Sequence, residues 1–168
     1  MLEAVGATPA ATREIWRYLF GVDLVARVRT HRLHAEHPLL LSLADARQLR
    51  ASVRDGTWVR LIEVGATLEG RRYLSEGALT FQLADPFCPW NEGVWTLEAG
   101  PDGAKLRRSS ASPDLRLSAA ELSAMYLGTV KATSLLQAGR LDELTAGATS
   151  RADALFRWTT PPWCLDDF

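Results

Sequence analysis

The chain has 168 residues, 47% of them hydrophobic, which suits one globular domain or one domain with part of a second. Its 19 basic and 20 acidic residues nearly cancel, so composition excludes the strong field of a nucleic-acid or anionic-membrane binder. Two cysteines are too few for a disulfide framework and favour a reducing compartment. The sequence shows no signal-peptide pattern and no apolar stretch near the length of a membrane span. We therefore expect a cytoplasmic protein.

The N-terminal part is predicted to begin with a helix. Thr8 can cap free N–H groups, Pro9 suits the first helical position, and apolar residues follow at helical spacing as far as Phe20. Gly21 can end this helix. A strand is expected next, over Leu24–Leu33.

A hairpin is expected to follow that strand. The dipeptide Asp55-Gly56 tolerates positive φ, and it joins two arms of strand-like composition, Gln48–Arg54 and Thr57–Glu63.

The rest of the chain predicts a short helix over Val64–Tyr73, then strands, then helices. The apolar residues Leu79, Phe81 and Leu83 alternate, as in a strand with one buried face. The other predicted elements are a hairpin of Val94–Glu98 and Ala104–Arg108, a strand over Asp114–Leu117, a helix capped by Ser118 and Glu121, a helix over Ala132–Ala138 and a helix from Ser150.

These elements predict an α+β fold with an antiparallel sheet of about five strands, helices on one side, and a separate helix and hairpin in front. We place a boundary near residue 62, between a partial domain over residues 1–62 and a complete one over residues 63–168. The first part is too small to bury its own apolar faces, which suggests a missing partner.

Several motifs follow one another in a distinctive order along nearly the whole chain. They are Trp58-Val-Arg-Leu-Ile-Glu-Val64, Leu68-Glu-Gly-Arg-Arg-Tyr73, Asp85-Pro-Phe-Cys-Pro-Trp-Asn-Glu-Gly93, Ser118–Leu127, Gly139-Arg140-Leu141, Ala154-Leu-Phe-Arg-Trp158 and Pro162-Trp-Cys-Leu-Asp-Asp-Phe168. In this order they resemble the enhanced intracellular survival (Eis) family of GNAT acetyltransferases. Thr8–Arg29 resembles the late part of that family's second GNAT-like domain, and the rest resembles its C-terminal sterol-carrier-protein-like domain.

The resemblance implies an enzyme that transfers acetyl from acetyl-CoA to amines such as aminoglycosides or lysine side chains, often as a hexamer. It also implies that the C-terminal carboxylate, here that of Phe168, is the general base. From the residues themselves, Asp166 and Asp167 can attract a cationic amine. Trp90 and Trp163, near loops and prolines, are candidates for lining a ligand pocket, although tryptophans in small domains are as readily core residues.

One departure from the family pattern limits what this chain can do alone. A GNAT enzyme holds the CoA pyrophosphate in an Arg/Gln-x-x-Gly-x-Gly/Ala loop before a helix, and no such run occurs here. Neither Tyr73 nor Tyr126 can be assigned as the general acid. We therefore expect no cofactor in this chain, acetyl-CoA only in an intact enzyme, and a separate catalytic GNAT domain as its partner.

Other residues that invite a functional interpretation have simpler ones. His31, His34 and His37 suggest a metal site, but on a strand the first two face opposite sides, so we expect exposed loop histidines and no metal. No histidine lies near either cysteine in sequence, so Cys88 and Cys164 are interpreted as packing residues.

Two further sets are assigned structural roles. Trp95 and Trp158 lie inside predicted regular elements and are expected in the core. The pairs Arg71-Arg72 and Arg107-Arg108 could bind phosphate, but solvated positions on a helix and a strand edge are preferred.

Three function hypotheses remain. The first is the substrate-shaping and scaffold part of an Eis-like N-acetyltransferase. The second is a free-standing sterol-carrier-like module that binds a lipid or another apolar ligand, and the third is a purely structural interaction domain.

Overall fold

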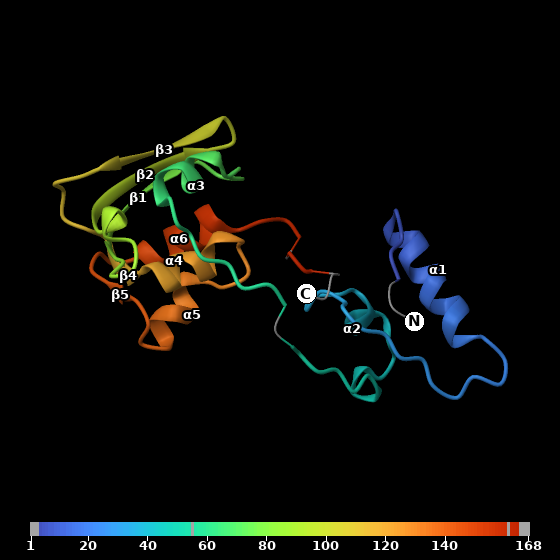
Figure 1. The fold of residues 1–168 in the computed structure, drawn as a ribbon. Coiled ribbons are helices and arrows are strands. Elements are labelled where there is room, and N and C mark those ends of the chain that lie inside the picture. The colour runs from blue at the N-terminus through green and yellow to red at the C-terminus, as the bar shows by residue number, and fades with distance from the viewer. Residues whose placement is uncertain (1–3, 55, 161, 165–168) are drawn as a thin grey trace. The chain divides into compact units, whose positions relative to one another are not determined.

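The computed structural model describes residues 4–54, 56–160 and 162–164 (Figure 1). The chain forms two compact units. The first unit consists of Met1–Trp58 with Trp163–Phe168, and the second unit consists of Val59–Pro162. Within the described ranges, no helix is both long and apolar enough to cross a membrane.

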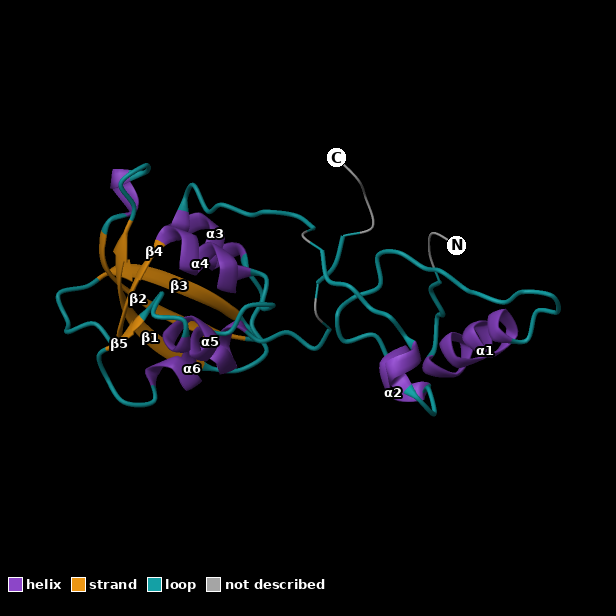
Figure 2. Ribbon diagram, turned by 90° about the horizontal axis from the view of Figure 1, so that it is seen from below, coloured by secondary structure: helices purple, strands orange, loops and turns teal. Residues whose placement is uncertain are grey.

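The second unit is built on a five-stranded sheet (Figure 2). The strands lie in the order β3-β2-β1-β4-β5. Their bounds are Gly77–Ala84 for β1, Gly93–Gly100 for β2, Gly103–Arg108 for β3, Leu115–Ser118 for β4 and Asp142–Glu143 for β5. The predicted alternation in β1 is confirmed, because Leu79, Phe81 and Leu83 are buried while their neighbours are less so.

The sheet is mixed, so the prediction of a purely antiparallel sheet is wrong for one pair of strands. β1 pairs antiparallel with β2, and Phe81 lies opposite Trp95, but β1 pairs parallel with β4, where Phe81 lies opposite Leu115. Residues 109–114 carry the chain from β3 to β4 without reversing its direction. Asp114 starts the new pairing by accepting a hydrogen bond from the Thr80 N–H at 3.0 Å.

Helices cover one face of this sheet, as predicted. Their buried residues join those of the sheet in one continuous hydrophobic core, while the other face carries polar residues such as Gln82 and Glu98. The helices are α3 (Val64–Gly70), α4 (Ala119–Tyr126), α5 (Ala132–Gln137) and α6 (Ala148–Phe156). α6 begins two residues before the predicted Ser150 because Gly147, with φ of 80°, ends the preceding turn.

The predicted capping box at the start of α4 is confirmed. The Ser118 hydroxyl accepts from the Ala120 N–H at 3.1 Å, and the Glu121 carboxylate accepts from the Ser118 N–H at 3.1 Å. Burial raises the pKa of Glu121, but hydrogen bonds from Ser118 and Arg140 outweigh it and hold the pKa below its usual value. The box fixes where the sheet ends and the helical layer begins.

Arg71 fastens helix ends together, so the prediction that it is solvated is wrong. Its guanidinium donates to the carbonyls of Tyr126 at 2.8 Å, Leu155 at 3.3 Å and Phe156 at 2.6 Å, which belong to the last turns of α4 and α6. These carbonyls have no acceptor role left inside their own helices. These contacts depend on the tertiary fold, because the three carbonyl groups lie 55 to 85 residues after Arg71 in the sequence.

The first unit contains little regular structure. The predicted first helix is confirmed as α1 (Pro9–Phe20), with Thr8 as N-cap and Gly21 as C-cap. The other elements are α2 (Leu39–Ser42) and a 3-10 turn over Ala46–Gln48.

The strands predicted for the first sixty residues are wrong. Neither Leu24–Leu33 nor the described residues of the two hairpin arms form a strand, and Asp55 of the predicted turn lies outside the described residues. Val53 and Trp58 remain 89% and 84% exposed, so the alternating pattern of the arms buries no face. Leu61 instead packs in the core of the second unit, where its N–H donates to the Ser123 hydroxyl.

Candidate functional site

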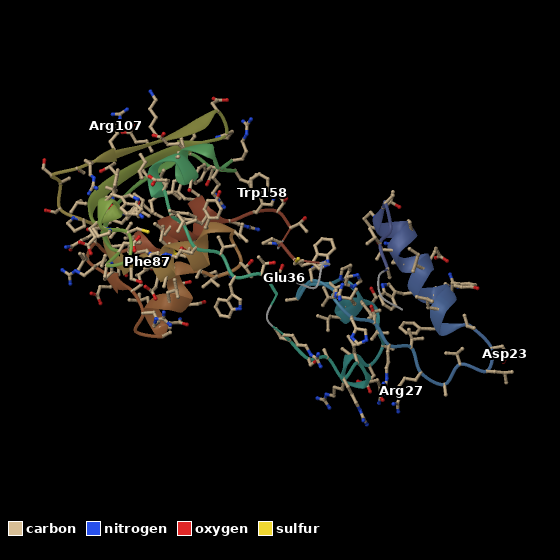
Figure 3. All side chains as sticks on the ribbon, in the orientation of Figure 1. Asp23, Arg27, Glu36, Phe87, Arg107 and Trp158 are labelled. Atoms are coloured by element: carbon tan, nitrogen blue, oxygen red, sulfur yellow. The ribbon has the colours of Figure 1, made fainter. Side chains whose placement is uncertain are left out.

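The loop over residues 85–91 presents Trp90, one of the predicted ligand-contacting residues. Trp90 is 53% exposed. Phe87 on the same loop, which Figure 3 labels, is 77% exposed. Single exposed apolar side chains are common on protein surfaces, but here two aromatic rings lie on one short loop. The loop therefore offers an aromatic surface from the second unit.

Asp85 and Asn91 hold this loop rigidly from inside. Both side chains are buried and joined by a 2.9 Å hydrogen bond from the Asn91 amide to the Asp85 carboxylate. Asp85 also accepts from the Cys88 N–H at 3.1 Å and pairs with Arg60. Burial raises the pKa of Asp85, but the hydrogen bonds from Asn91 and Cys88 and the charge of Arg60 together hold it below its usual value.

The segment before α3 pins the same loop from outside. The Ile62 carbonyl accepts from the Trp90 indole N–H at 3.1 Å and from the Asn91 amide at 2.9 Å. The Arg60 guanidinium lies 5.1 Å from the centre of the Phe87 ring, a cation–π distance. The exposed aromatic rings are thus held in place by contacts within the chain.

The cysteine in this loop is not set up for catalysis. Cys88 is 1% exposed, and the three histidines of the sequence all lie in the first unit. A nucleophilic thiol needs access and a base. The prediction that Cys88 is a packing residue is supported by its burial, while Cys164 is half-buried.

Trp163 lies in the first unit, on a cluster of aromatic rings defined here as Trp16, Phe20, His34, His37 and Trp163. Its indole N–H donates to the Arg32 carbonyl at 2.8 Å, and its ring contacts His34 edge-on with centroids 5.8 Å apart. Contacts of 5.2 to 5.8 Å then link His34 to His37, His37 to Trp16, and Trp16 to Phe20. Trp90 and Trp163 belong to different units.

The histidines of this cluster are packing residues, so the prediction of exposed loop histidines is wrong for His37, which is buried, and for His34, which is half-buried. His37 is 7% exposed, and its Nδ1 accepts from the Leu39 N–H at 3.1 Å. Burial lowers its pKa, and the nearby His34 lowers it further. His31 stays exposed. Across the described part of the chain, no group of three or more His, Cys, Asp or Glu side chains could hold a metal ion.

The remaining predicted site residues, Asp166, Asp167 and Phe168, lie outside the described residues. Trp163, three residues before Asp166, is described and is held by Arg32 and His34. Its partners, Arg32 and His34, were not recognised as contacts from the sequence, and the only available signal was the aromatic and histidine content of both segments.

Two of the structural assignments for tryptophan and arginine also change. Trp95 is half-buried against the core, and its indole N–H donates to the Asn91 carbonyl at 2.7 Å. Trp158, however, is 41% exposed, so its assignment to the core is wrong. Arg108 lies over the Trp95 ring at 4.0 Å, which leaves Arg107 as the solvated member of that pair.

Tyr73 is a buried tyrosine of the second unit. Burial raises the pKa of Tyr73 to about 12, although Arg71 acts in the opposite direction. Its hydroxyl donates to the Leu68 carbonyl at 2.9 Å. Tyr73 is therefore a structural donor.

The helix N-termini are supplied with acceptors by the chain itself. α1 uses the Thr8 hydroxyl, α4 uses Ser118, and the Thr149 N–H of α6 donates to the Glu143 carboxylate at 2.8 Å. An acetyl-CoA pyrophosphate needs such N–H groups free beside a glycine-rich loop. The N–H groups of Ala11, Ala120 and Thr149 are already paired within the chain.

Comparisons with known proteins show which domains and relatives this chain resembles. Residues 64–165 match the sterol carrier protein domain, and residues 1–61 match the acetyltransferase (GNAT) domain. An uncharacterised N-acetyltransferase of Streptomyces coelicolor is 38% identical over 99% of this chain and 40% of its own length. The N-acetyltransferase Eis of Mycobacterium tuberculosis is 29% identical over 95% of this chain and 39% of its own length.

A solved structure agrees with these relatives. The crystal structure of Eis1 from Mycobacterium abscessus matches 98% of this chain and 41% of its own, with a TM-score of 0.84 and 31% identity. The chain thus spans about 40% of the length of the relatives it matches. The α+β fold with a five-stranded sheet is the fold of that neighbour, and homologues of the chain are N-acetyltransferases. Because residues 64–165 are more than half of it, the chain belongs to the sterol carrier protein domain family.

Proposed function

We propose that this chain is the C-terminal, substrate-shaping and scaffold part of a cytoplasmic Eis-type, acetyl-CoA-dependent N-acetyltransferase, and that it works in an oligomer. The observation that carries the proposal is the likeness to Eis1, which extends over 98% of this chain but only 41% of that protein. The domain boundary near residue 62 belongs to the same proposal. A catalytic GNAT domain that binds acetyl-CoA is the partner.

The chemical role proposed for this chain is removal of a proton from the amine. An ammonium has no lone pair, so it must lose a proton before its nitrogen can attack an acetyl carbonyl. The C-terminal carboxylate of Phe168 accepts that proton, directly or through water. Asp166 and Asp167 attract the cationic amine, which is an aminoglycoside or a lysine side chain.

The anchoring of Trp163 supports this role. Chain ends are ordinarily mobile, and a mobile carboxylate is a poor base because its position is not fixed. Trp163 is held by the Arg32 carbonyl and the His34 ring. It thereby fixes the chain five residues before the proposed base. Trp90, on the second unit, stays a separate candidate for contact with a ligand.

The test combines this chain with the complementary segment, defined as the part of the Streptomyces coelicolor relative that this chain does not cover. Acetylation of an aminoglycoside is followed by release of the CoA thiol. We expect activity from the mixture and none from either part alone. Inactivity of a mixture that demonstrably associates would contradict the proposal.

A semisynthetic chain with a C-terminal amide tests the base. The amide keeps every side chain but removes the carboxylate, so kcat/KM should fall by about 10²-fold to 10⁴-fold. Phe168→Leu is the matched control, because it keeps both the length and the carboxylate. Equal activity of the amide and acid forms would refute the role of the carboxylate.

The sterol carrier match also raises binding of an apolar ligand as a second candidate. In this chain, however, side chains such as Phe81, Met125 and Phe156 fill the layer between sheet and helices and are 1% to 3% exposed. Native mass spectrometry after incubation with palmitate tests it. Retention of a stoichiometric fatty acid would favour this second function.

A further inference from the structure

His34 and His37, named here the histidine pair, lie together because of a turn in the chain. The His37 N–H donates to the His34 carbonyl at 3.0 Å, and the centroids of the two rings lie 5.2 Å apart. The His37 Nδ1 accepts from the Leu39 N–H at 3.1 Å, at the start of α2. An imidazole nitrogen accepts a hydrogen bond only when it carries no proton, so this contact requires a neutral His37 ring.

The surroundings of the histidine pair suit neutral rings. His37 is buried, and its ring meets the Trp16 ring edge-on at 5.8 Å between centroids. Among the described residues, the buried His34 Nδ1 and Trp16 Nε1 have no hydrogen-bond partner. A proton added at His34 Nδ1 would therefore find no acceptor among them, and two charged rings at this distance would repel each other.

Charged side chains on the elements around the histidine pair are mostly exposed. α2 carries none, and α1 reaches the pair through Trp16. Burial is the first cause that lowers the pKa of His37, and His34 is the second. Exposed charges act more weakly because water screens them. The titratable and charged side chains on these elements are Arg13, Glu14, Arg17 and Tyr18 of α1, Arg29, His31, Arg32 and Glu36 of the segment that carries the pair, and Cys164 beside Trp163.

Trp163 attaches the tail segment, defined as residues 162–164, to the same pair. Its ring contacts the His34 ring edge-on, and its indole N–H donates to the carbonyl of Arg32, two residues before His34. A movement of His34 therefore reaches Trp163 directly. A movement of His37 reaches it through the contact between the two imidazole rings.

The geometry points to the histidine pair as a pH-dependent switch on the tail segment, which holds Trp163 while both rings are neutral and releases it when the pair binds a proton. Protonation turns the His37 Nδ1 into a donor, so it can no longer accept from the Leu39 N–H and the ring must turn away. The His34 ring packed on it is then displaced, together with the contact to Trp163. The consequence for catalysis rests on the proposed function, because release of Trp163 withdraws the C-terminal carboxylate and slows acetylation at low pH.

Fluorine NMR of the chain labelled with fluorotryptophan is the first test. The signal of residue 163 is assigned by its absence from Trp163→Phe. Between about pH 7.5 and about pH 5, this signal should shift with the same midpoint as the ring protons of His37, which lies below 6.5. A signal of residue 163 that stays constant while His37 titrates would overturn the inference.

His37→Asn separates the proton from the hydrogen bond. The asparagine Oδ1 takes the place of Nδ1 as an acceptor for the Leu39 N–H, but asparagine does not titrate. The signal of residue 163 should therefore stay at its neutral-pH position throughout. His31→Asn, the same change at an exposed histidine, should leave the pH response intact. A response that persists unchanged in His37→Asn would refute the role of His37.

The reverse measurement leaves the histidine pair itself unaltered. If Trp163 binds the neutral pair more tightly than the charged pair, the chain must bind a proton more readily once this tryptophan is removed. Trp163→Ala should therefore move the midpoint of the His37 titration to higher pH. Trp158→Ala, at a tryptophan of similar exposure in the other unit, should not move it. Equal midpoints in Trp163→Ala and the unchanged chain would contradict the coupling.

Acetylation in the mixture with the complementary segment separates the switch from the proposed function. Protonation of the amine lowers activity at low pH in every variant, so the measure is the kcat of His37→Asn divided by that of the unchanged chain. This ratio should rise at least about threefold between about pH 7.5 and about pH 5.5. A constant ratio would overturn the switch and leave the function. A switch seen by fluorine NMR in an associated mixture without acetylation would defeat the function alone.

Discussion

The two units of this chain differ in how their apolar residues are used. In the second unit, the alternating residues of β1 and the stripes of α4 and α6 are buried in one core. In the first unit, comparable patterns remain in solvent, as Leu41 at 92% and Val53 at 89% exposure show. Patterns of the same kind fold into a sheet where partner strands are present and stay irregular where they are not. The difference shows that a pattern of apolar residues forms a sheet in this chain only where neighbouring strands pair with it.

The largest expected effect comes from removing a core ring in the second unit. Phe81 is 1% exposed in the central strand, so Phe81→Ala should lower the free energy of unfolding by about 3–5 kcal/mol. Phe87 is 77% exposed, and Phe87→Ala should change the free energy of unfolding by less than about 0.5 kcal/mol. Urea unfolding followed by circular dichroism measures both. Similar losses of unfolding free energy in the two variants would contradict the assignment of Phe81 to the core and of Phe87 to the surface.

The next effect concerns Arg71, which holds the ends of α4 and α6. Arg71→Met removes the donors to the carbonyls of Tyr126, Leu155 and Phe156 and should cost about 2–3 kcal/mol in the same measurement. Arg72→Met is the matched control on an exposed neighbour and should be nearly neutral. If both variants are neutral, the contacts of Arg71 do not stabilise the second unit.

A smaller effect is expected in the first unit. Trp163→Phe keeps an aromatic ring against His34 but loses the hydrogen bond to the Arg32 carbonyl, which should cost about 1 kcal/mol. Amide exchange in α1 and residues 30–37 reports this loss. Trp158→Phe, at a tryptophan with similar exposure in the other unit, is the control and should leave those amides unaffected.

The smallest expected effect is a difference in the pH at which the two units begin to lose stability. The pKa of His37 is lower in the folded chain than in the unfolded chain, so as the pH falls the unfolded chain binds a proton first. The stability that neutral His37 gives the folded chain is therefore complete above about pH 6.5. It is lost as the pH falls towards the pKa of His37 in the folded chain. For Asp85, whose pKa lies below 3.8 in the folded state, the loss begins only as pH falls below about 4.

Two-dimensional NMR between pH 7 and pH 5 should therefore broaden amides of the first unit and leave β1 unchanged. His37→Phe should remove this response, and His31→Gln, at an exposed histidine, should not. Simultaneous loss of signals from both units would contradict the assignment to His37.

Sequence patterns predicted the second unit well because its signals are local. The Ser118–Glu121 capping box, the glycine-rich turn between β2 and β3, and the alternation in β1 each depend on residues close together in the chain. The direction of β4 was not predictable, because it depends on the route of residues 109–114. The role of Arg71 was equally hidden, since its acceptors are backbone carbonyls that carry no sequence signature.

The candidate site was predicted less completely than the fold. The exposure of Trp90 and the anchoring of Trp163 agree with roles at a surface, but the contacts that hold them came from the fold. Residues 24–33 were predicted as a strand on composition alone, and composition cannot say whether a partner strand exists. The roles of Phe168, Asp166 and Asp167 stay predictions.

The first unit combines an early segment with Trp163, and the hydrogen bond from Trp163 to Arg32 joins positions 131 residues apart. On a translating ribosome, this contact cannot form until the whole second unit has been synthesised. The sheet of the second unit can therefore fold before this contact of the first unit forms.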